Sequence, residues 1–287
     1  MAESIDTKDW TLIIKPNSSP FKIDLKEIWR YRDLVMLFVK RDFVSLYKQT
    51  ILGPLWFFIQ PILTTVTFVI IFGNVAQIST DGYPQILFYL SGITLWNYFS
   101  ECINKTASVF IDNASVFGKV YFPRLTVPLS IIISNLLKFL IQFSLFISVW
   151  IYFYIQGKIH PDIKLIVLIT PLLIIISGTL ALGTGIIISS LTTKYRDLRF
   201  LITFGVQLLM YASPIVYPLS VIKGTKYELL ILANPMTPVI EIFKNIYLGG
   251  DILNMKYLAY SGVVTVIILF VGVLIFNKVE KTFMDTI

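Results

Sequence analysis

In this 287-residue chain, the residue types and spacing that could best serve a chemical role are those of three polar side chains, Asn135, Lys138 and Gln142. Their spacings of three and four place them on one face of a helix. That helix lies in an otherwise apolar run from Leu125 to Ile155, which is long enough to cross a membrane. Because polar groups at membrane depth are costly, the pattern predicts a pairing or pore-facing role for Lys138. The alternatives are a lysine that snorkels to the interface and a structural clamp between helices.

No residue pattern in the sequence is typical of an enzyme site. The single histidine, His160, and the single cysteine, Cys102, exclude a multi-histidine or cysteine-rich metal site. Gly118 and Lys119 lack the upstream glycine and the following hydroxyl residue of a phosphate-binding loop. We therefore expect no metal and no cofactor on this chain. Any energy source for transport would be another chain or an ion gradient.

Composition places the chain in a membrane. Hydrophobic residues make up 56% of it and charged residues only 14%, whereas a soluble domain carries about a quarter charged residues. The predicted fold is an all-α integral membrane domain with six transmembrane helices. The six apolar stretches are Ile51–Gly73, Tyr83–Asn104, Leu125–Ile155, Leu165–Thr193, Phe200–Ile222 and Tyr257–Phe276. Residues 1–50 form a cytoplasmic N-terminal segment, and residues 51–287 form the transmembrane domain.

The basic residues predict the orientation. Seventeen lysines and arginines fall on the side of both termini, and six fall on the other side. Because basic residues collect on the cytoplasmic side, both termini are predicted to be cytoplasmic in a multi-pass protein. The basic excess is thus explained by topology, and we expect no nucleic-acid partner.

The segment from Asp24 to Lys48 predicts an N-terminal amphipathic surface helix. Lys26, Arg30 and Lys40 fall on one face, and apolar residues fall on the opposite face, which is expected to lie along the inner membrane surface. Asp42 falls on the apolar face, so we expect a cation or a helix N-terminus beside it.

Short outer-face helices are predicted between spans five and six, in an outer segment of about residues 222–256. Thr237 is predicted to cap one of them, and Gly249 to end it. This helix is expected to rest on the outer surface, with Glu241, Lys244 and Asn245 facing away from its apolar side. Pro214 and Pro218 break the preceding span near the outer leaflet, as happens where a helix is buried or lines a cavity.

Aromatic residues are abundant, with 22 Phe, 15 Tyr and 5 Trp. Interfacial belts and packing explain most such rings. Rings that line a pore would instead stack on sugars without selecting one sugar, which suits a sliding glycan chain. The candidates for this channel are Trp56, Phe68, Phe72, Trp96, Phe99 and Tyr211.

Four blocks of sequence, in order, resemble the ABC-2 type permeases that export polysaccharides such as O-antigen and teichoic acid. The first is WRYRDLVMLFVKRDFVSLYKQTILGPLWFFIQPI at Trp29–Ile62, and the second is GKVYFPRLTVPLS at Gly118–Ser130. The third combines YRDLR at Tyr195–Arg199, Gln207 and SPIVYP at Ser213–Pro218. The fourth is NPMTPVIEIFKNIYLGG at Asn234–Gly250, where Lys244 stands in place of the arginine expected in many relatives.

The resemblance implies a homodimer with its channel between the two copies, in the bacterial cytoplasmic (inner) membrane. Two copies of a cytoplasmic ABC ATPase subunit, which bind ATP and Mg, would dock on Leu25–Lys48 and Ser108–Lys119. The implied coupling residues are Arg41, Asp42, Asp112, Asn113, Lys119, Tyr195 and Arg196. The segment Ile222–Gly249 would gate the channel mouth, and the implied outer-gate residues are Pro214, Pro218, Asn234, Pro235 and Phe243. The substrate would be a lipid-linked, O-antigen-like polysaccharide.

Three alternatives remain at the level of sequence. The cargo could be another glycopolymer or lipid, such as teichoic acid or capsule. A secondary transporter would need intramembrane carboxylates for ion coupling, and the spans offer only Glu101, near an end. A membrane-embedded glycan or lipid enzyme would need paired acids or metal ligands, which the sequence lacks.

Overall fold

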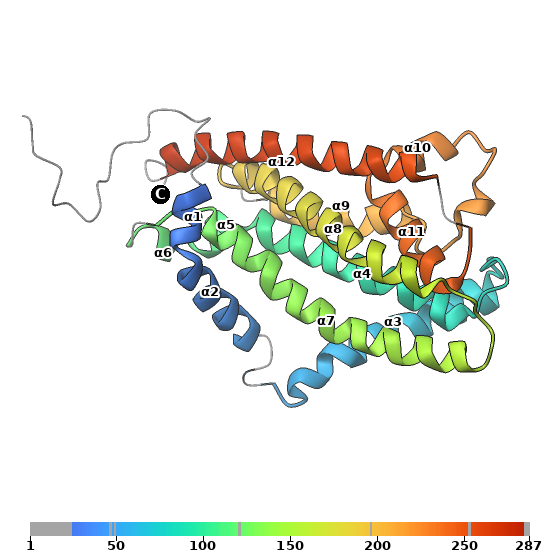
Figure 1. Cartoon of the computed structure of the whole chain (residues 1–287). Coiled ribbons are helices and arrows are strands. Elements are labelled where there is room, and N and C mark those ends of the chain that lie inside the picture. Colours follow the sequence, from blue (N-terminus) through green and yellow to red (C-terminus); the bar gives the residue numbers. More distant parts are fainter. Residues whose placement is uncertain are drawn as a thin grey trace, which may run out of the picture.

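The structure, a computed structural model, describes residues 25–45, 48, 50–119, 122–195, 197–251 and 254–283. Within these residues every regular element is a helix, which confirms the predicted all-α class. The helices run side by side between two ends of an elongated bundle (Figure 1).

Four helical segments are long and apolar enough to cross a membrane: Gly53–Val75, Thr126–Ile155, Ile163–Thr192 and Met255–Val279. The first comprises η1 (Gly53–Leu55), α3 (Trp56–Phe68) and the π-helical segment η2 (Val69–Val75). The others are α7 (Thr126–Ile155), α8 (Ile163–Thr192) and most of α12 (Met255–Phe283). They correspond to the predicted first, third, fourth and sixth spans.

The predicted second and fifth spans differ from these four, because one is mostly buried and the other is short. The second is α4 (Gln85–Ala107), most of which is buried among α3, α7, α8, α9 and α11. Because its neighbours shield it, α4 can carry the polar residues Asn97, Glu101 and Lys105. The fifth is α9 (Leu198–Tyr211), a 14-residue helix that ends shortly before Pro214. Both run along the bundle (Figure 1).

At one end of the bundle, which we call the inner end, lie the N-terminal helices and the α4–α7 connection (Figure 1). The predicted single helix over 24–48 is two helices, α1 (Leu25–Arg30) and α2 (Arg32–Ser45). Its apolar residues Val35, Phe38 and Val39 are buried, so this face packs on the protein and not on the membrane. The connection adds two single turns, α5 (Val109–Asp112) and α6 (Ala114–Phe117).

The inner end is held by an aromatic cluster that the sequence pattern did not predict. Phe38 of α2 lies 5.8 Å from Phe122, and Phe110 of α5 stacks 4.6 Å from Phe276 of α12. Both pairs belong to one buried cluster that also includes Val127 of α7. The cluster joins α2, the α4–α7 connection and the ends of α7 and α12 into one packed body.

At the outer end lie η3 (Leu219–Val221), α10 (Glu228–Ala233) and α11 (Met236–Leu248), in the region predicted to hold short helices. Gly249 ends α11 in the left-handed conformation, with φ 82°, as its sequence position predicted. The predicted cap at Thr237 is wrong, because α11 begins earlier and the Met236 N–H donates to the Asn234 side chain.

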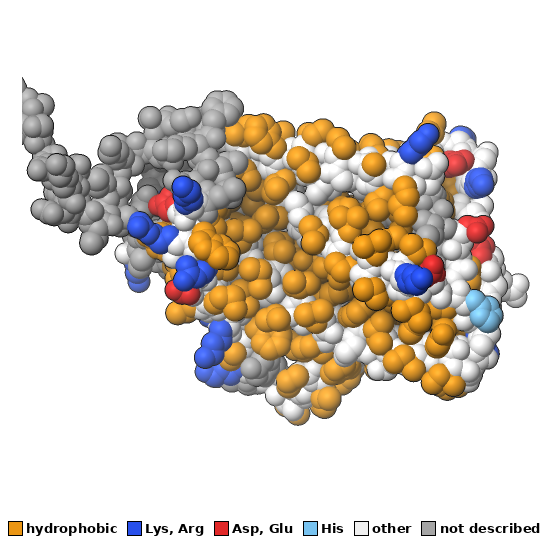
Figure 2. All heavy atoms as spheres, viewed as in Figure 1, with side chains coloured by type: hydrophobic (Ala, Val, Ile, Leu, Met, Phe, Trp, Pro, Cys, Tyr) orange, Lys and Arg blue, Asp and Glu red, His pale blue; other side chains and the backbone are white. Residues whose placement is uncertain are grey.

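The surface matches a membrane setting. Figure 2 shows apolar side chains over the middle of the bundle and charged side chains gathered toward its two ends. Helix α1 and the C-terminal end of α12 both lie at the inner end (Figure 1). The basic residues of α1 and α2 are there as well.

Small residues on α8 allow its neighbours to approach closely. A Cβ on Gly178 would lie 2.4 Å from the Tyr98 hydroxyl, and one on Gly183 would lie 2.8 Å from the backbone nitrogen of Leu269. The second contact involves the backbone of α12, which cannot rotate away as a side chain can. The α8–α12 contact therefore depends on the absence of a side chain at Gly183.

We expect Gly183→Ala to lower the thermal stability of the detergent-solubilised protein. Overpacking of a tight contact costs about 1–3 kcal/mol, which exceeds the gain of about 1 kcal/mol from replacing a helical glycine with alanine. The matched control is Gly262→Ala on α12, where a Cβ would meet nothing within 4 Å. Equal melting temperatures for the two variants would contradict this account of the packing.

Candidate functional site

The polar residues inside the bundle form a cluster between α4 and α7. Lys138 forms an ion pair with Glu101 of α4, with side-chain exposures of 12% and 24%. The Lys138 ammonium also lies 5.8 Å from the centre of the Phe57 ring on α3. One lysine thus joins α7 to α3 and α4, which agrees with the pairing role that the sequence suggested and identifies the partner.

The polar atoms of the cluster differ in whether they have hydrogen-bond partners. Asn135 accepts a hydrogen bond of 3.4 Å from Lys105 and donates to the Ile131 carbonyl. Within the described chain, Glu101 Oε2 and Gln142 Nε2 are buried without a hydrogen-bond partner. Glu101, Lys138 and Gln142 line a narrow pocket that has no room for a water molecule. Sequence analysis noted Glu101 only as a charge near a span end, because its pairing depends on how α4 packs on α7.

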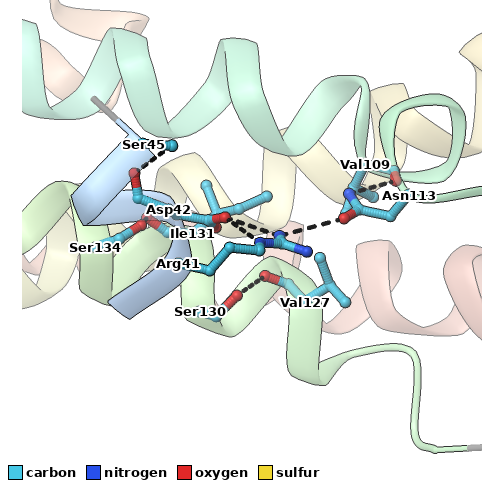
Figure 3. Close-up of polar contacts among 9 residues, drawn as sticks. All are labelled: Arg41, Asp42, Ser45, Val109, Asn113, Val127, Ser130, Ile131 and Ser134. Carbon is cyan, nitrogen blue, oxygen red and sulfur yellow. Dashed lines mark hydrogen bonds and ion pairs between the residues drawn. The ribbon is translucent and has the colours of Figure 1, made fainter. Parts of the chain in front are cut away.

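Several predicted coupling residues meet at the inner end. Figure 3 shows Arg41 reaching from α2 toward Asp42 and Asn113. Arg41 Nε donates to Asp42 at 2.8 Å, and its terminal nitrogen donates to Asn113 Oδ1 at 3.4 Å. The Arg41 guanidinium also lies over the Phe38 ring, 4.8 Å from its centre. The expected cation beside Asp42 is therefore its own neighbour in sequence, Arg41.

A second set of contacts ties the same connection to α9. The Asp112 carboxylate accepts hydrogen bonds from Ser108 and from Arg199, the latter at 3.3 Å. Arg199 belongs to the YRDLR block, so that block lies beside the α4–α7 connection. Of its other residues, Tyr195 is exposed and Arg196 lies outside the described residues. Lys119 is exposed at the end of the connection.

The six predicted channel rings fall into two groups. Phe68, Trp96 and Phe99 are at most 7% exposed, and side chains of the same subunit cover them. Trp96 packs 5.4 Å from Phe99, and Phe68 packs edge-on to Phe72, which is partly buried. Trp56 and Tyr211 are 47% and 46% exposed. Only these last two present a large ring area to the surroundings of the subunit.

The predicted outer-gate residues lie together. Pro214 and Pro218 are buried in the turns that follow α9. Asn234 donates to the Ser213 hydroxyl at 2.9 Å, and the Pro235 carbonyl accepts from Ser261 of α12 at 2.7 Å. Phe243 packs 5.8 Å from Phe146 of α7 and is fully buried.

The polar face of α11 is not exposed, contrary to the sequence expectation. Glu241 is 7% exposed and Lys244 is 1% exposed. The helix packs against α4, α8 and α12, so it is inserted into the outer end of the bundle and does not rest on its surface. Burial raises the pKa of Glu241 and lowers that of Lys244, and each charge opposes the shift of the other. Sequence analysis missed Lys244 as a site residue because the i, i+3 spacing from Glu241 also fits a solvated face.

Breaking the Lys138–Glu101 pair is expected to destabilise the bundle. Lys138→Met keeps most of the side-chain volume but leaves the Glu101 carboxylate without its cation. Because the pair is partly open, the cost should be somewhat below the roughly 3–5 kcal/mol of a fully buried pair. The measurement is thermal unfolding in detergent.

The matched variant for this test is Lys138→Met combined with Glu101→Gln. Since it removes both charges, it should melt closer to the native protein than Lys138→Met does. Strictly additive effects of the two substitutions would contradict a direct pair.

A family model and several individual proteins that match this chain all belong to transport or export systems. Residues 33–248 match the family described as ABC-2 type transporter. The chain is 26% identical over 264 residues to the O-antigen export system permease protein RfbA of Myxococcus xanthus, covering 92% of this chain and 98% of that protein. It is 28% identical over 253 residues to the RfbA protein of Klebsiella pneumoniae, covering 88% and 94%. The polysialic acid transport protein KpsM of Escherichia coli is 25% identical over 249 residues, covering 86% and 93%.

Proposed function

The chain belongs to the ABC-2 type transporter family, and on that premise we propose that it is the transmembrane subunit of an ATP-driven polysaccharide exporter. The cargo we propose is a lipid-linked, O-antigen-like polysaccharide, moved across the bacterial inner membrane. The similarity to O-antigen export permeases along nearly the whole chain carries this proposal. ATP hydrolysis would occur on a separate subunit that binds ATP and Mg.

The inner end supplies the docking surface for that ATPase in our proposal. Ser115 and Lys119 are exposed on the α4–α7 connection. The aromatic cluster beneath them joins the connection to α2 and α12. A movement of the ATPase against the α4–α7 connection would therefore be transmitted to the ends of several long helices at once, as a coupling surface requires. Two copies of the ATPase would serve two copies of this chain.

The channel would lie between those two copies. The face of α9 that carries Phe200, Phe204, Leu208 and Tyr211 is unpartnered, with each of these residues at least 46% exposed. We propose that Tyr211 and Trp56 contact the glycan and that α4 and α9 complete a set of six spans. Both chain termini would be cytoplasmic, because the described ends lie together with the basic α1 and α2.

Two alternative functions, export of a capsule-type polysaccharide and ion-coupled transport, are not equally well supported. The similarity to KpsM favours a capsule-type polysaccharide as the second candidate cargo. Ion-coupled transport is less well supported, because Glu101, the carboxylate within the spans, is already paired with Lys138. A proton or sodium ion that binds Glu101 would have to compete with the charge of that lysine.

Ser115→Arg combined with Lys119→Glu should uncouple this subunit from its ATPase. Both side chains are exposed, so the fold should persist while the surface loses complementarity to the partner. We expect co-purification of the ATPase and ATP-dependent export to fall roughly tenfold or more, since losing about 1.4 kcal/mol of binding has that effect.

The control is Lys256→Glu, an exposed charge reversal beside the outer end. It should leave ATPase binding unchanged. Normal export by a well-expressed Ser115→Arg/Lys119→Glu variant would count against docking at this connection.

Tyr211→Ala and Trp56→Ala should slow export while the subunit assembles normally. Stacking on a ring is worth about 1 kcal/mol, so each loss should change the export rate several-fold. Phe270→Ala on α12, whose ring is 55% exposed, serves as a lipid-facing control and should have little effect. The readout is the amount of surface glycan per folded subunit. Equal export by all three variants would refute contact of these two rings with the glycan.

A further inference from the structure

The turn after α9 contains a backbone carbonyl that the sequence leaves without a helical donor. In a helix, the carbonyl of Pro214 would accept from the N–H of residue 218. Residue 218 is also a proline and has no N–H. Because Pro214 is buried, water is not available to replace that donor, and another group of the protein has to supply it.

Lys244 supplies the missing donor. Its Nζ donates to the Pro214 carbonyl at 2.9 Å, across 30 residues of sequence. The same nitrogen lies 3.3 Å from the centre of the Phe88 ring on α4. A cation held against a ring face and a carbonyl is stabilised by both. One ammonium group thus joins α11, the turn after α9 and the central helix α4.

The charge of Lys244 is balanced from within the same helix. Glu241 precedes it by one turn, and the Asp81 carboxylate also acts on both groups. Glu241 is 7% exposed, and its Oε2 has no hydrogen-bond partner among the described residues. Removal of Lys244 would leave that carboxylate buried without its nearest cation, so the arrangement depends on this one side chain.

The turn itself lies directly on α4. A Cβ built on Gly92 would be 3.6 Å from the Cβ of Ile215, and Ile215 is fully buried. The turn is therefore in close contact with α4. It can move away from α4 only if Lys244 breaks its contacts with Pro214 and Phe88. Packed contacts of this kind favour two discrete arrangements over a continuous movement.

We propose that Lys244 is the positioning residue of the outer gate, and that its ammonium group holds the turn at residues 213–217 closed against α4. This inference rests on the proposed function, in which the outer segment closes the channel mouth. The role differs from that of a channel-lining residue, because Lys244 is 1% exposed and acts through the turn.

The first test uses Lys244→Met, which keeps the length and apolar body of the side chain without its charge. In vesicles that contain this subunit with its ATPase and no ATP, we expect leakage of a small fluorescent dye to rise roughly tenfold or more. Hydrogen bonds to charged groups shift an equilibrium by at least about that factor. Lys244→Arg should restore tight closure, because it returns a cation with donors. Lys226→Met, an exposed lysine of the same segment, is the control and should not leak.

The second test reads the position of the turn directly. Gly92→Cys and Ile215→Cys, in a Cys102→Ala background, place two thiols at the Cβ separation of a disulfide. With Lys244 present, oxidation should cross-link them efficiently, and Lys244→Met should lower the yield. Once formed, the disulfide should suppress the leak of the Lys244→Met variant, and a reductant should restore that leak.

The outcomes separate this inference from the proposed function. A folded Lys244→Met variant with an unchanged cross-linking yield and no leak would overturn the role of Lys244. A leak that the disulfide does not suppress would overturn it as well. If the disulfide forms with Lys244 present but export continues, the outer segment does not gate the channel and the proposed function loses that element. If Lys244→Met fails to fold, Lys244→Met combined with Glu241→Gln removes the ammonium group together with the buried charge that it balances. An unchanged cross-linking yield in that variant would overturn the inference.

Discussion

Polar groups inside an apolar bundle have to be satisfied by the protein itself, because neither lipid nor water does it for them. The central helix α4 meets this constraint at both of its ends. Near the inner end its Glu101 pairs with Lys138 of α7, and near the outer end its Phe88 ring receives Lys244 of α11. Each lysine comes from a different helix, so α4 is fixed to its surroundings by two charged contacts. The apolar helices α3, α7 and α8 then pack around it.

The two ends of the bundle are built differently. The inner end is held by packed aromatic rings, with polar contacts such as Arg41–Asn113 at its rim. The outer end combines the apolar packing of α11, such as Phe243 on Phe146, with hydrogen bonds from side chains to backbone carbonyls. Lys244 donates to Pro214 in this way, and Ser261 donates to Pro235. Apolar packing suits a surface that transmits force as one body, because close-packed interiors deform little. Directional hydrogen bonds suit a segment with two defined positions, since they are either made or broken.

Helix α9 begins at the inner end and stops within the bundle, before the outer end. Its Arg199 contacts Asp112 of the inner connection, and its last residue, Tyr211, precedes the turn held by Lys244. The Arg199–Asp112 pair is about half exposed, so it adds little stability and is readily remade. The short length of α9 follows from Pro214 and Pro218, which stop the helix within the bundle. An exposed aromatic face on a short helix beside a breakable turn fits an element that moves during transport.

The sequence determined the all-α membrane class, the places of four of its six predicted spans, the break at Pro214 and the turn at Gly249. Apolar run length, proline and glycine act locally, which is why these features could be predicted. It also indicated that Lys138 and Asp42 need partners, since a charge in an apolar pattern has to be compensated wherever it lies. It did not determine that Glu101 is the partner of Lys138, that Phe68, Trp96 and Phe99 are covered by their own subunit, or that Glu241 and Lys244 are buried. An amphipathic pattern has the same period whether its polar face meets water or other polar groups. Only the packing of α11 against α4, α8 and α12 decided which it is.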